Sequence, residues 1–234
     1  MNGVAAIYQK ELATYFRSPI AYFVIAVFLL GTGYFFIYNI FLTGVGTMDE
    51  TFKNMGILLV TLIPVLTMRL FSGEYNARTM ELLATLPLRP WQIVAGKYLG
   101  AMTIFLIMTA ATAINLIPLY LYGTPQTSNI VSGYIGFVLL GVACLAIGQF
   151  FSALTQNQIV AALITIPVLL AFWFVGYAQN FQAGTLRTLV DYISFSQHFG
   201  DFIKGLVRTE AIAFYLIVSA IALTLNTSYL KWQR

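Results

Sequence analysis

The side chains of this sequence that could bind a partner gather in one short stretch, residues 71–90. Within it Glu74, Arg78 and Glu81 follow at i, i+4 and i+7, so on a helix they would line one face and could pair. Apolar side chains stand beside this stripe: Met80, Leu82, Leu83 and Leu86. A helix that lies in a groove of a partner gains from apolar burial and is oriented by such charges. The spacing therefore indicates recognition of another protein, with a solvated loop helix as the alternative.

The rest of the sequence lacks the patterns of an enzyme. A nucleotide site would need a glycine-rich loop that ends in Gly-Lys-Ser/Thr, but the single Gly-Lys pair, Gly96-Lys97, is followed by Tyr98. His198 is the sole histidine, which argues against His-based metal sites and most acid–base relays. We therefore predict no catalytic residue, no metal site and no cofactor in this chain.

The composition places the charged stretch in a membrane protein. Of the 234 residues, 59% are hydrophobic and only 9% are charged, and the mean hydropathy is +0.83. Soluble domains carry roughly 25% charged residues. A segment that crosses hydrocarbon must satisfy its own backbone hydrogen bonds, so the expected fold is all-α and integral to the membrane.

Six apolar segments are long enough to cross the bilayer as helices, which takes about 20 residues. Within a single domain over residues 1–234, they are residues 20–42, 55–71, 98–122, 130–154, 159–181 and 211–230. The second is the weakest, because it is short, contains Pro64 and carries Arg69 near its end. Away from their ends the spans hold no Asp, Glu, Lys or Arg, which disfavours an ion-coupled transporter and a membrane hydrolase.

Further helices are expected between and before the spans. Residues 1–18 have the amphipathic pattern of a helix that lies in the interface plane. Ser72 suits an N-cap and Pro87 stops a helix, so the sequence predicts a helix from Glu74 to Thr85.

Another amphipathic helix is expected before the last span. Its apolar residues recur at helical spacing and include Phe195, Phe199 and Phe202. The pattern predicts a helix on the outer surface, and an ordinary interfacial helix is the alternative.

The positions of Lys and Arg predict the orientation. With six spans both termini share a side, and that side holds eight cations: Lys10, Arg17, Arg69, Arg78, Arg89, Lys97, Lys231 and Arg234. The other side holds four: Lys53, Arg187, Lys204 and Arg208. We therefore predict cytoplasmic termini and a cytoplasmic Glu74–Thr85 helix.

The central stretch also carries a family resemblance. It reads Glu74-x-x-x-Arg78-Thr79-x-Glu81-Leu82-Leu83-x-Thr85-x-Pro87, followed by Gln92-Ile93-x-x-Gly96-Lys97-Tyr98. These motifs resemble the ABC-2 type transporter permeases, and in particular the gliding-motility and nitrous-oxide-reductase-maturation permease subunits. Two other segments share the likeness: Lys10-Glu11-x-x-x-Tyr15-Phe16-x-Ser18-Pro19 and Phe199-x-x-Phe202-x-x-Gly205. The usual pattern has Gly before the Thr, where this sequence has Arg78.

The resemblance implies a set of partners and roles. Residues 1–18 would be an elbow helix, and residues 74–85 a coupling helix that docks into a separate ATP-binding subunit, which holds ATP and magnesium. The coupling residues would be Glu74, Arg78, Thr79, Glu81, Leu82, Leu83 and Pro87. The external gate residues would be Phe195, Phe199 and Phe202.

The expected function follows from these readings. The first hypothesis is a homodimeric, multi-pass permease of the bacterial inner membrane that couples ATP hydrolysis in the partner to transport, with export favoured. Membrane lipid is an expected partner, and an extracytoplasmic accessory protein is a further candidate. Nucleic acid is not an expected partner. The alternatives are a membrane scaffold that anchors partners without moving cargo, and a secondary transporter or channel.

Overall fold

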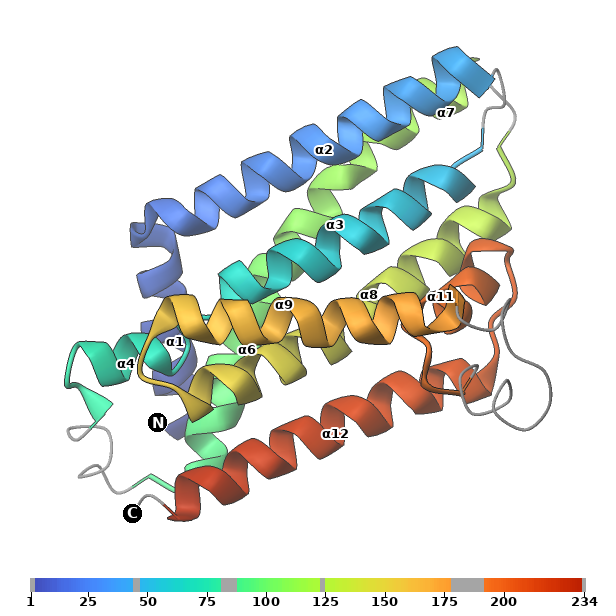
Figure 1. Ribbon diagram of the computed structural model, residues 1–234. Coiled ribbons are helices and arrows are strands. Elements are labelled where there is room, and N and C mark those ends of the chain that lie inside the picture. The colour runs from blue at the N-terminus through green and yellow to red at the C-terminus, as the bar shows by residue number, and fades with distance from the viewer. Residues whose placement is uncertain (1–2, 44–46, 81–87, 123–124, 178–191, 233–234) are drawn as a thin grey trace.

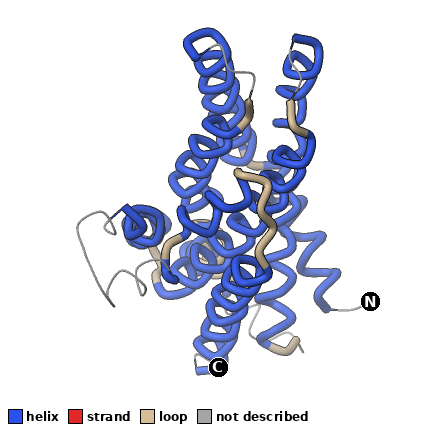
Figure 2. Tube along the Cα trace, turned by 90° about the vertical axis from the view of Figure 1, so that its right-hand side faces the viewer, coloured by secondary structure: helices blue, strands red, loops and turns tan. Residues whose placement is uncertain are grey.

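The long apolar runs of the sequence form helices in this computed structural model, which describes residues 3–43, 47–80, 88–122, 125–177 and 192–232. These residues contain no strand (Figure 2). The elements in chain order are α1 (Gly3–Arg17), α2 (Pro19–Thr43), α3 (Asp49–Thr67), α4 (Ser72–Asn76), α6 (Pro90–Ala111), a 3₁₀ turn η1 (Thr112–Asn115), α7 (Leu116–Tyr122), α8 (Thr127–Leu154), α9 (Gln158–Phe174), α11 (Phe195–Ile203) and α12 (Thr209–Trp232). The prediction of an all-α fold is confirmed.

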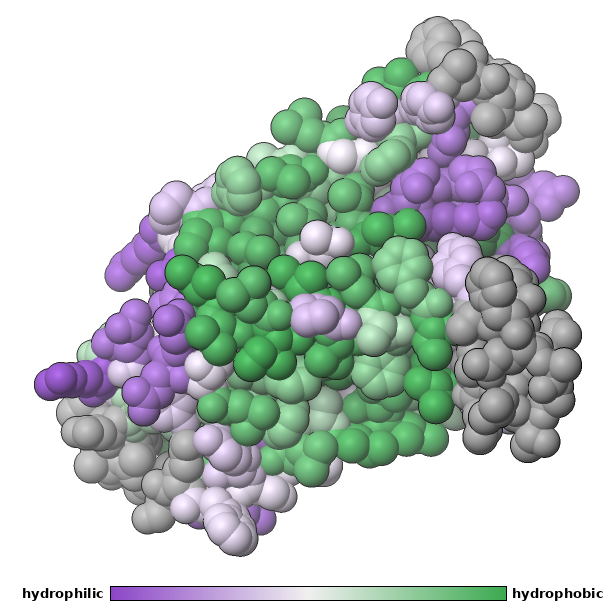
Figure 3. Space-filling view, viewed as in Figure 1, coloured by the Kyte–Doolittle hydropathy of each residue, from purple (hydrophilic) through white to green (hydrophobic). Residues whose placement is uncertain are grey.

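Six helical segments are long and apolar enough to cross a membrane, as the sequence predicts. They are Pro19–Ile40, Asp49–Asn76, Pro90–Leu121, Thr127–Leu154, Gln158–Tyr177 and Thr209–Trp232. Figure 3 shows a broad apolar band across the middle of the bundle, with polar residues gathered at its two ends. The chain is therefore a multi-pass membrane protein.

Two of these segments start earlier than the hydropathy of the sequence suggests. The second begins at Asp49 and the third at Pro90, several residues before the apolar runs that start near 55 and 98. The third span is also broken by η1, just before Pro118. Proline lacks the N–H that would bond four residues back, so the helix tightens into a 3₁₀ turn there.

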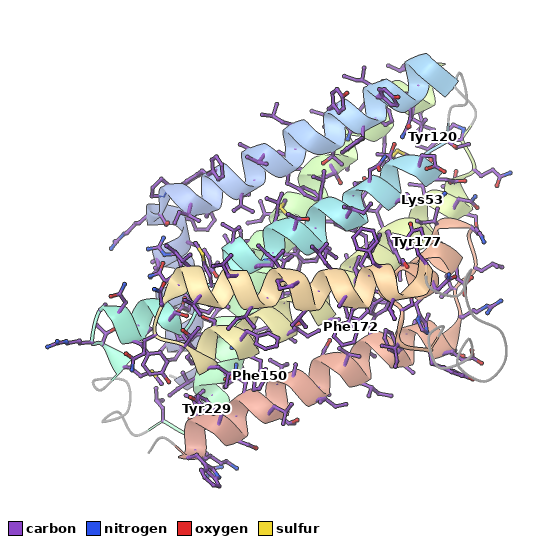
Figure 4. The ribbon with its side chains drawn as sticks, viewed as in Figure 1. Lys53, Tyr120, Phe150, Phe172, Tyr177 and Tyr229 are labelled. Atoms are coloured by element: carbon purple, nitrogen blue, oxygen red, sulfur yellow. The ribbon has the colours of Figure 1, made fainter. Side chains whose placement is uncertain are left out.

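The spans surround two central helices. α3 and α8 are the most buried spans, and they contact each other and α9, while α12 and α6 pack on α8. Both chain ends lie at one end of the bundle, which we call the terminal end, and α4 lies there too (Figure 1). α11 and the tip of α7 lie at the opposite end. Tyr229 marks the terminal end, whereas Tyr120 and Tyr177 mark the opposite end (Figure 4), which is the usual placement of aromatic side chains at membrane interfaces.

The N-terminal helix α1 packs along the first half of α6. Two glycines on α6 make the contact close: a Cβ atom at Gly96 would lie 2.7 Å from the side chain of Ile7, and one at Gly100 would lie 2.7 Å from Cβ of Glu11. Small residues four apart let two helices approach in this way. α1 is therefore docked on the bundle through Ile7, Glu11 and Tyr15, which are all buried.

A buried ion pair lies at the centre of this contact. The ammonium group of Lys97, on α6, donates to the carboxylate of Glu11, on α1, and the Lys97 residue is only 1% exposed. Taking both charges out of water costs more than a surface pair does, and only close geometry offsets that cost. The pair therefore fixes the register between α1 and α6.

Replacing Lys97 with methionine should destabilise the protein strongly. Glu11 would remain buried without its cation, and breaking a buried pair in this way costs about 3–5 kcal/mol. Thermal unfolding in detergent should show a clearly lower midpoint for Lys97→Met, and the double variant Glu11→Leu/Lys97→Met should recover most of the loss because no lone charge remains there.

The matched control is Lys53→Met. Lys53 pairs with Glu50 at 2.6 Å on the surface of the same protein, where ion pairs are worth about 0–1 kcal/mol. An unchanged midpoint for Lys97→Met would contradict the role of the buried pair.

Candidate functional site

The segment with the recognition pattern lies at the terminal end, between α3 and α6. The predicted continuous helix from Glu74 to Thr85 is wrong over its described part. α4 ends at Asn76, and Arg78 adopts a left-handed backbone conformation with φ of 54°. Glu81, Leu82, Leu83 and Pro87 lie outside the described residues, so their coupling roles stay a prediction.

The end of α4 is a Schellman motif, which explains the break. The N–H of Thr79 donates to the carbonyl of Glu74 at 3.0 Å, and the N–H of Arg78 donates to the carbonyl of Tyr75 at 3.1 Å. This pattern requires a left-handed residue at the position of Arg78, which glycine adopts freely and other residues at a cost of about 1–2 kcal/mol. The Gly that the resembled family carries at this place is thus the residue that the local geometry favours.

The start of this turn is hydrogen-bonded to the end of α8. Ser72 is not the N-cap that the sequence suggests, since Phe71 holds that position. The Ser72 hydroxyl instead donates to the carbonyl of Ser152 at 2.9 Å. The Ser152 hydroxyl accepts from the backbone N–H groups of Phe71 and Ser72 at 3.0 and 3.2 Å, and donates to the carbonyl of Met68 at 2.9 Å. The turn therefore cannot move without α8 unless these bonds break.

Glu74 makes a second set of contacts, consisting of ion pairs and a hydrogen bond. One oxygen of its carboxylate accepts from Lys10 at 2.7 Å and from Lys97 at 3.2 Å, and the other accepts from the hydroxyl of Thr79. The Lys97 ammonium also lies over the ring of Phe71, 5.4 Å from its centroid. Glu74 thus extends the Glu11–Lys97 pair into a charged cluster that joins α1, α4 and α6.

The predicted charged stripe is consequently split. Glu74 faces the bundle, whereas the side chain of Arg78 is exposed on the turn. Glu74 and Thr79 are brought together, and the Arg78 side chain stays exposed. We name the described part of this feature, Ser72–Thr79, the docking turn.

A cavity of about 520 Å³ opens beside the docking turn. α1 contributes Lys10 and Tyr15 to its walls, and the end of α3 contributes Arg69. The Tyr15 hydroxyl donates to the carbonyl of Leu66 at 3.0 Å, and burial raises the pKa of this phenol well above its ordinary value, which keeps it a neutral donor. The Arg69 guanidinium donates to the hydroxyl of Ser18, at the corner between α1 and α2.

The external gate candidates lie at the opposite end of the bundle, on α11. Phe195, Phe199 and Phe202 are fully buried against α8, α3 and α9 and do not lie on a surface. Ser132 of α8 donates to the carbonyl of Phe202 at 2.7 Å. The helix is amphipathic as predicted, but its apolar face closes the end of the bundle.

Lys97 and Glu11 belong to the charged cluster around Glu74, although the sequence did not identify them as site residues. Lys97 falls just before the apolar run that starts at Tyr98, so it counted as an interfacial charge. The available signal was the pair Gly96 and Gly100 around it, which indicates a close helix partner that must supply a counter-charge.

Known proteins with a similar sequence indicate the family to which the chain belongs. A sequence model described as "ABC-2 family transporter protein" matches residues 51–227, from the start of α3 to near the end of α12. Over 162 residues the chain is 26% identical to "Probable multidrug ABC transporter permease YbhR" of Escherichia coli strain K12, and equally to its counterpart in strain O157:H7. These alignments cover 68% of this chain and 41% of each relative, so the chain spans about two fifths of the length of these relatives.

The family match takes in the docking turn, all of α8 and α11, three complete spans, and most of the second and sixth spans. The prediction of the family from the motifs around Glu74 is confirmed. The chain belongs to the ABC-2 family of transporter proteins.

Proposed function

We propose that this protein is the membrane-spanning permease subunit of an ATP-driven ABC transporter. A separate ATP-binding subunit would dock on the docking turn and on the residues that follow it, and would hold ATP and magnesium. Membership of the ABC-2 family and the printed name of the Escherichia coli relatives support a permease. We expect hydrolysis in the partner because the sequence carries no phosphate-binding loop.

The observation that carries the proposal is that two sets of polar contacts hold the docking turn. A hydrogen bond from Ser72 to Ser152 connects it to α8. Ion pairs of Glu74 with Lys97 and Lys10 connect it to α6 and α1. A force on the exposed side of the turn would therefore reach three helices together. Such a rigid connection is what a subunit needs if closure of an ATP-binding partner is to move membrane spans.

The remaining parts of the proposal concern the assembly. Two copies of the chain would form the translocation unit in the bacterial inner membrane, with both termini in the cytoplasm and with export as the direction. α11 would close the pathway at the external end through Phe195, Phe199 and Phe202. A membrane scaffold with no cargo is the alternative, and it would assemble with the ATP-binding subunit without any transport.

Reversing the charge of Arg78 should weaken assembly with the ATP-binding subunit. Arg78 is exposed on the docking turn, and losing one partner of a desolvated charge pair at an interface costs about 2–5 kcal/mol. Arg78→Glu and Glu81→Lys should each lower co-purification of the partner, or uncouple its ATPase activity from transport, while membrane insertion stays normal.

Arg208→Glu provides the control for assembly, because Arg208 is an exposed arginine that directly precedes α12 and pairs with Asp201 of α11, far from the docking turn. If Arg78→Glu and Glu81→Lys both assembled and transported like wild type, the docking proposal would be contradicted.

The orientation can be measured with single cysteines. Asn76 lies on the docking turn and Thr127 begins α8 at the opposite end, and both are exposed. In a background that lacks the buried Cys144, a membrane-impermeant thiol reagent added to intact cells should label Thr127→Cys and spare Asn76→Cys. Labelling of Asn76→Cys from outside would reverse the proposed topology.

A further inference from the structure

Arg69 is a cation in the cavity beside the docking turn that has only a neutral partner. Its guanidinium donates to the Ser18 hydroxyl, and no carboxylate within the described ranges pairs with it. The other cations of the cavity, Lys10 and Lys97, are matched by Glu11 and Glu74. Three cations therefore face two carboxylates, and the excess positive charge belongs to Arg69.

The position of this cavity identifies the source of a matching anion. Two of its lining residues stand at the ends of membrane spans, Ser18 just before α2 and Gln158 at the start of α9. Arg69 lies just after the last residue of α3. The ends of spans lie at the level of the lipid headgroups, where every phospholipid carries a phosphate group. The cavity is thus a polar recess with a surplus cation at the depth of the phosphates.

We propose that the phosphate group of a membrane phospholipid binds in this cavity against Arg69. A guanidinium presents several N–H donors in one plane and matches the oxygens of a phosphate with two parallel bonds. The Gln158 amide lines the same cavity and can donate to the phosphate as well. The bound lipid would join the α1–α2 corner at Ser18 to the end of α3. The docking turn lines the same cavity, so the bound lipid would lie beside the surface proposed for the ATP-binding subunit.

Binding to the purified full-length protein in detergent tests this proposal. Native mass spectrometry would count phosphatidylglycerol retained from mixed micelles, with diacylglycerol and inorganic phosphate as separate arms. We expect wild type to retain phosphatidylglycerol, to bind diacylglycerol far more weakly, and to show no comparable binding of inorganic phosphate. Arg69→Gln should weaken phosphatidylglycerol binding about tenfold or more, since a charge-assisted hydrogen bond is lost.

Two further variants make the result specific. Lys53→Gln removes a cation near the other end of α3 and should bind like wild type. Gln158→Glu adds a negative charge to the cavity while leaving Arg69 in place, and it should also weaken binding. This variant keeps the test valid if Arg69→Gln does not fold.

Several results would overturn the assignment. Equal retention of phosphatidylglycerol by wild type and both cavity variants would show that the cavity is not the site. Equal binding of diacylglycerol would mean that only the acyl chains are recognised, and equal binding of inorganic phosphate would replace the lipid with a free anion. If Arg69→Gln instead lost only the ATP-binding subunit, a protein carboxylate would be the occupant.

Discussion

The structure of the terminal end depends on one buried cation, Lys97. An ammonium group that is 1% exposed needs carboxylates close by, because its desolvation is otherwise too costly. Those carboxylates come from two different elements, Glu11 on α1 and Glu74 on the docking turn. The requirement that carboxylates balance the buried Lys97 charge therefore sets the positions of both the N-terminal helix and the proposed docking surface.

The central helix α8 extends this connection through the membrane. Its Ser152 holds the root of the docking turn, and its Ser132 donates to the backbone of α11 at the opposite end. From residue 132 to residue 152 a helix rises about 30 Å, which is the thickness of the hydrocarbon core. The same helix thus contacts both regions that the sequence singled out, and it links the proposed docking surface physically to α11 at the far end.

The sequence predicts the spans well and the docking turn poorly, for a physical reason. Hydropathy is a property of each segment, so six apolar runs were sufficient to expect six helices. The end of α4 is decided by tertiary contacts: Glu74 faces the bundle to reach Lys97, and Ser72 bonds to Ser152 of a distant helix. The spacing of Glu74 and Arg78 alone favours a continuous helix, and the conformation of Arg78 departs from that local preference. Its place in the family motif, where glycine is usual, was the one local sign of a left-handed residue.

The cluster around Lys97 should make the docking turn and α1 move as one body. Spin labels at Asn76 on the turn and Ala13 on α1, both exposed, can report the distance between them by pulsed electron paramagnetic resonance in the assembled transporter. Labelled chains diluted with unlabelled ones would isolate the distance within one copy. We expect the same Ala13–Asn76 distance distribution with and without ATP, while the Asn76–Asn76 distance between two copies labelled at Asn76 alone changes. A shift of the Ala13–Asn76 distance on ATP binding would contradict this expectation, because the turn would then move free of the Lys97 cluster.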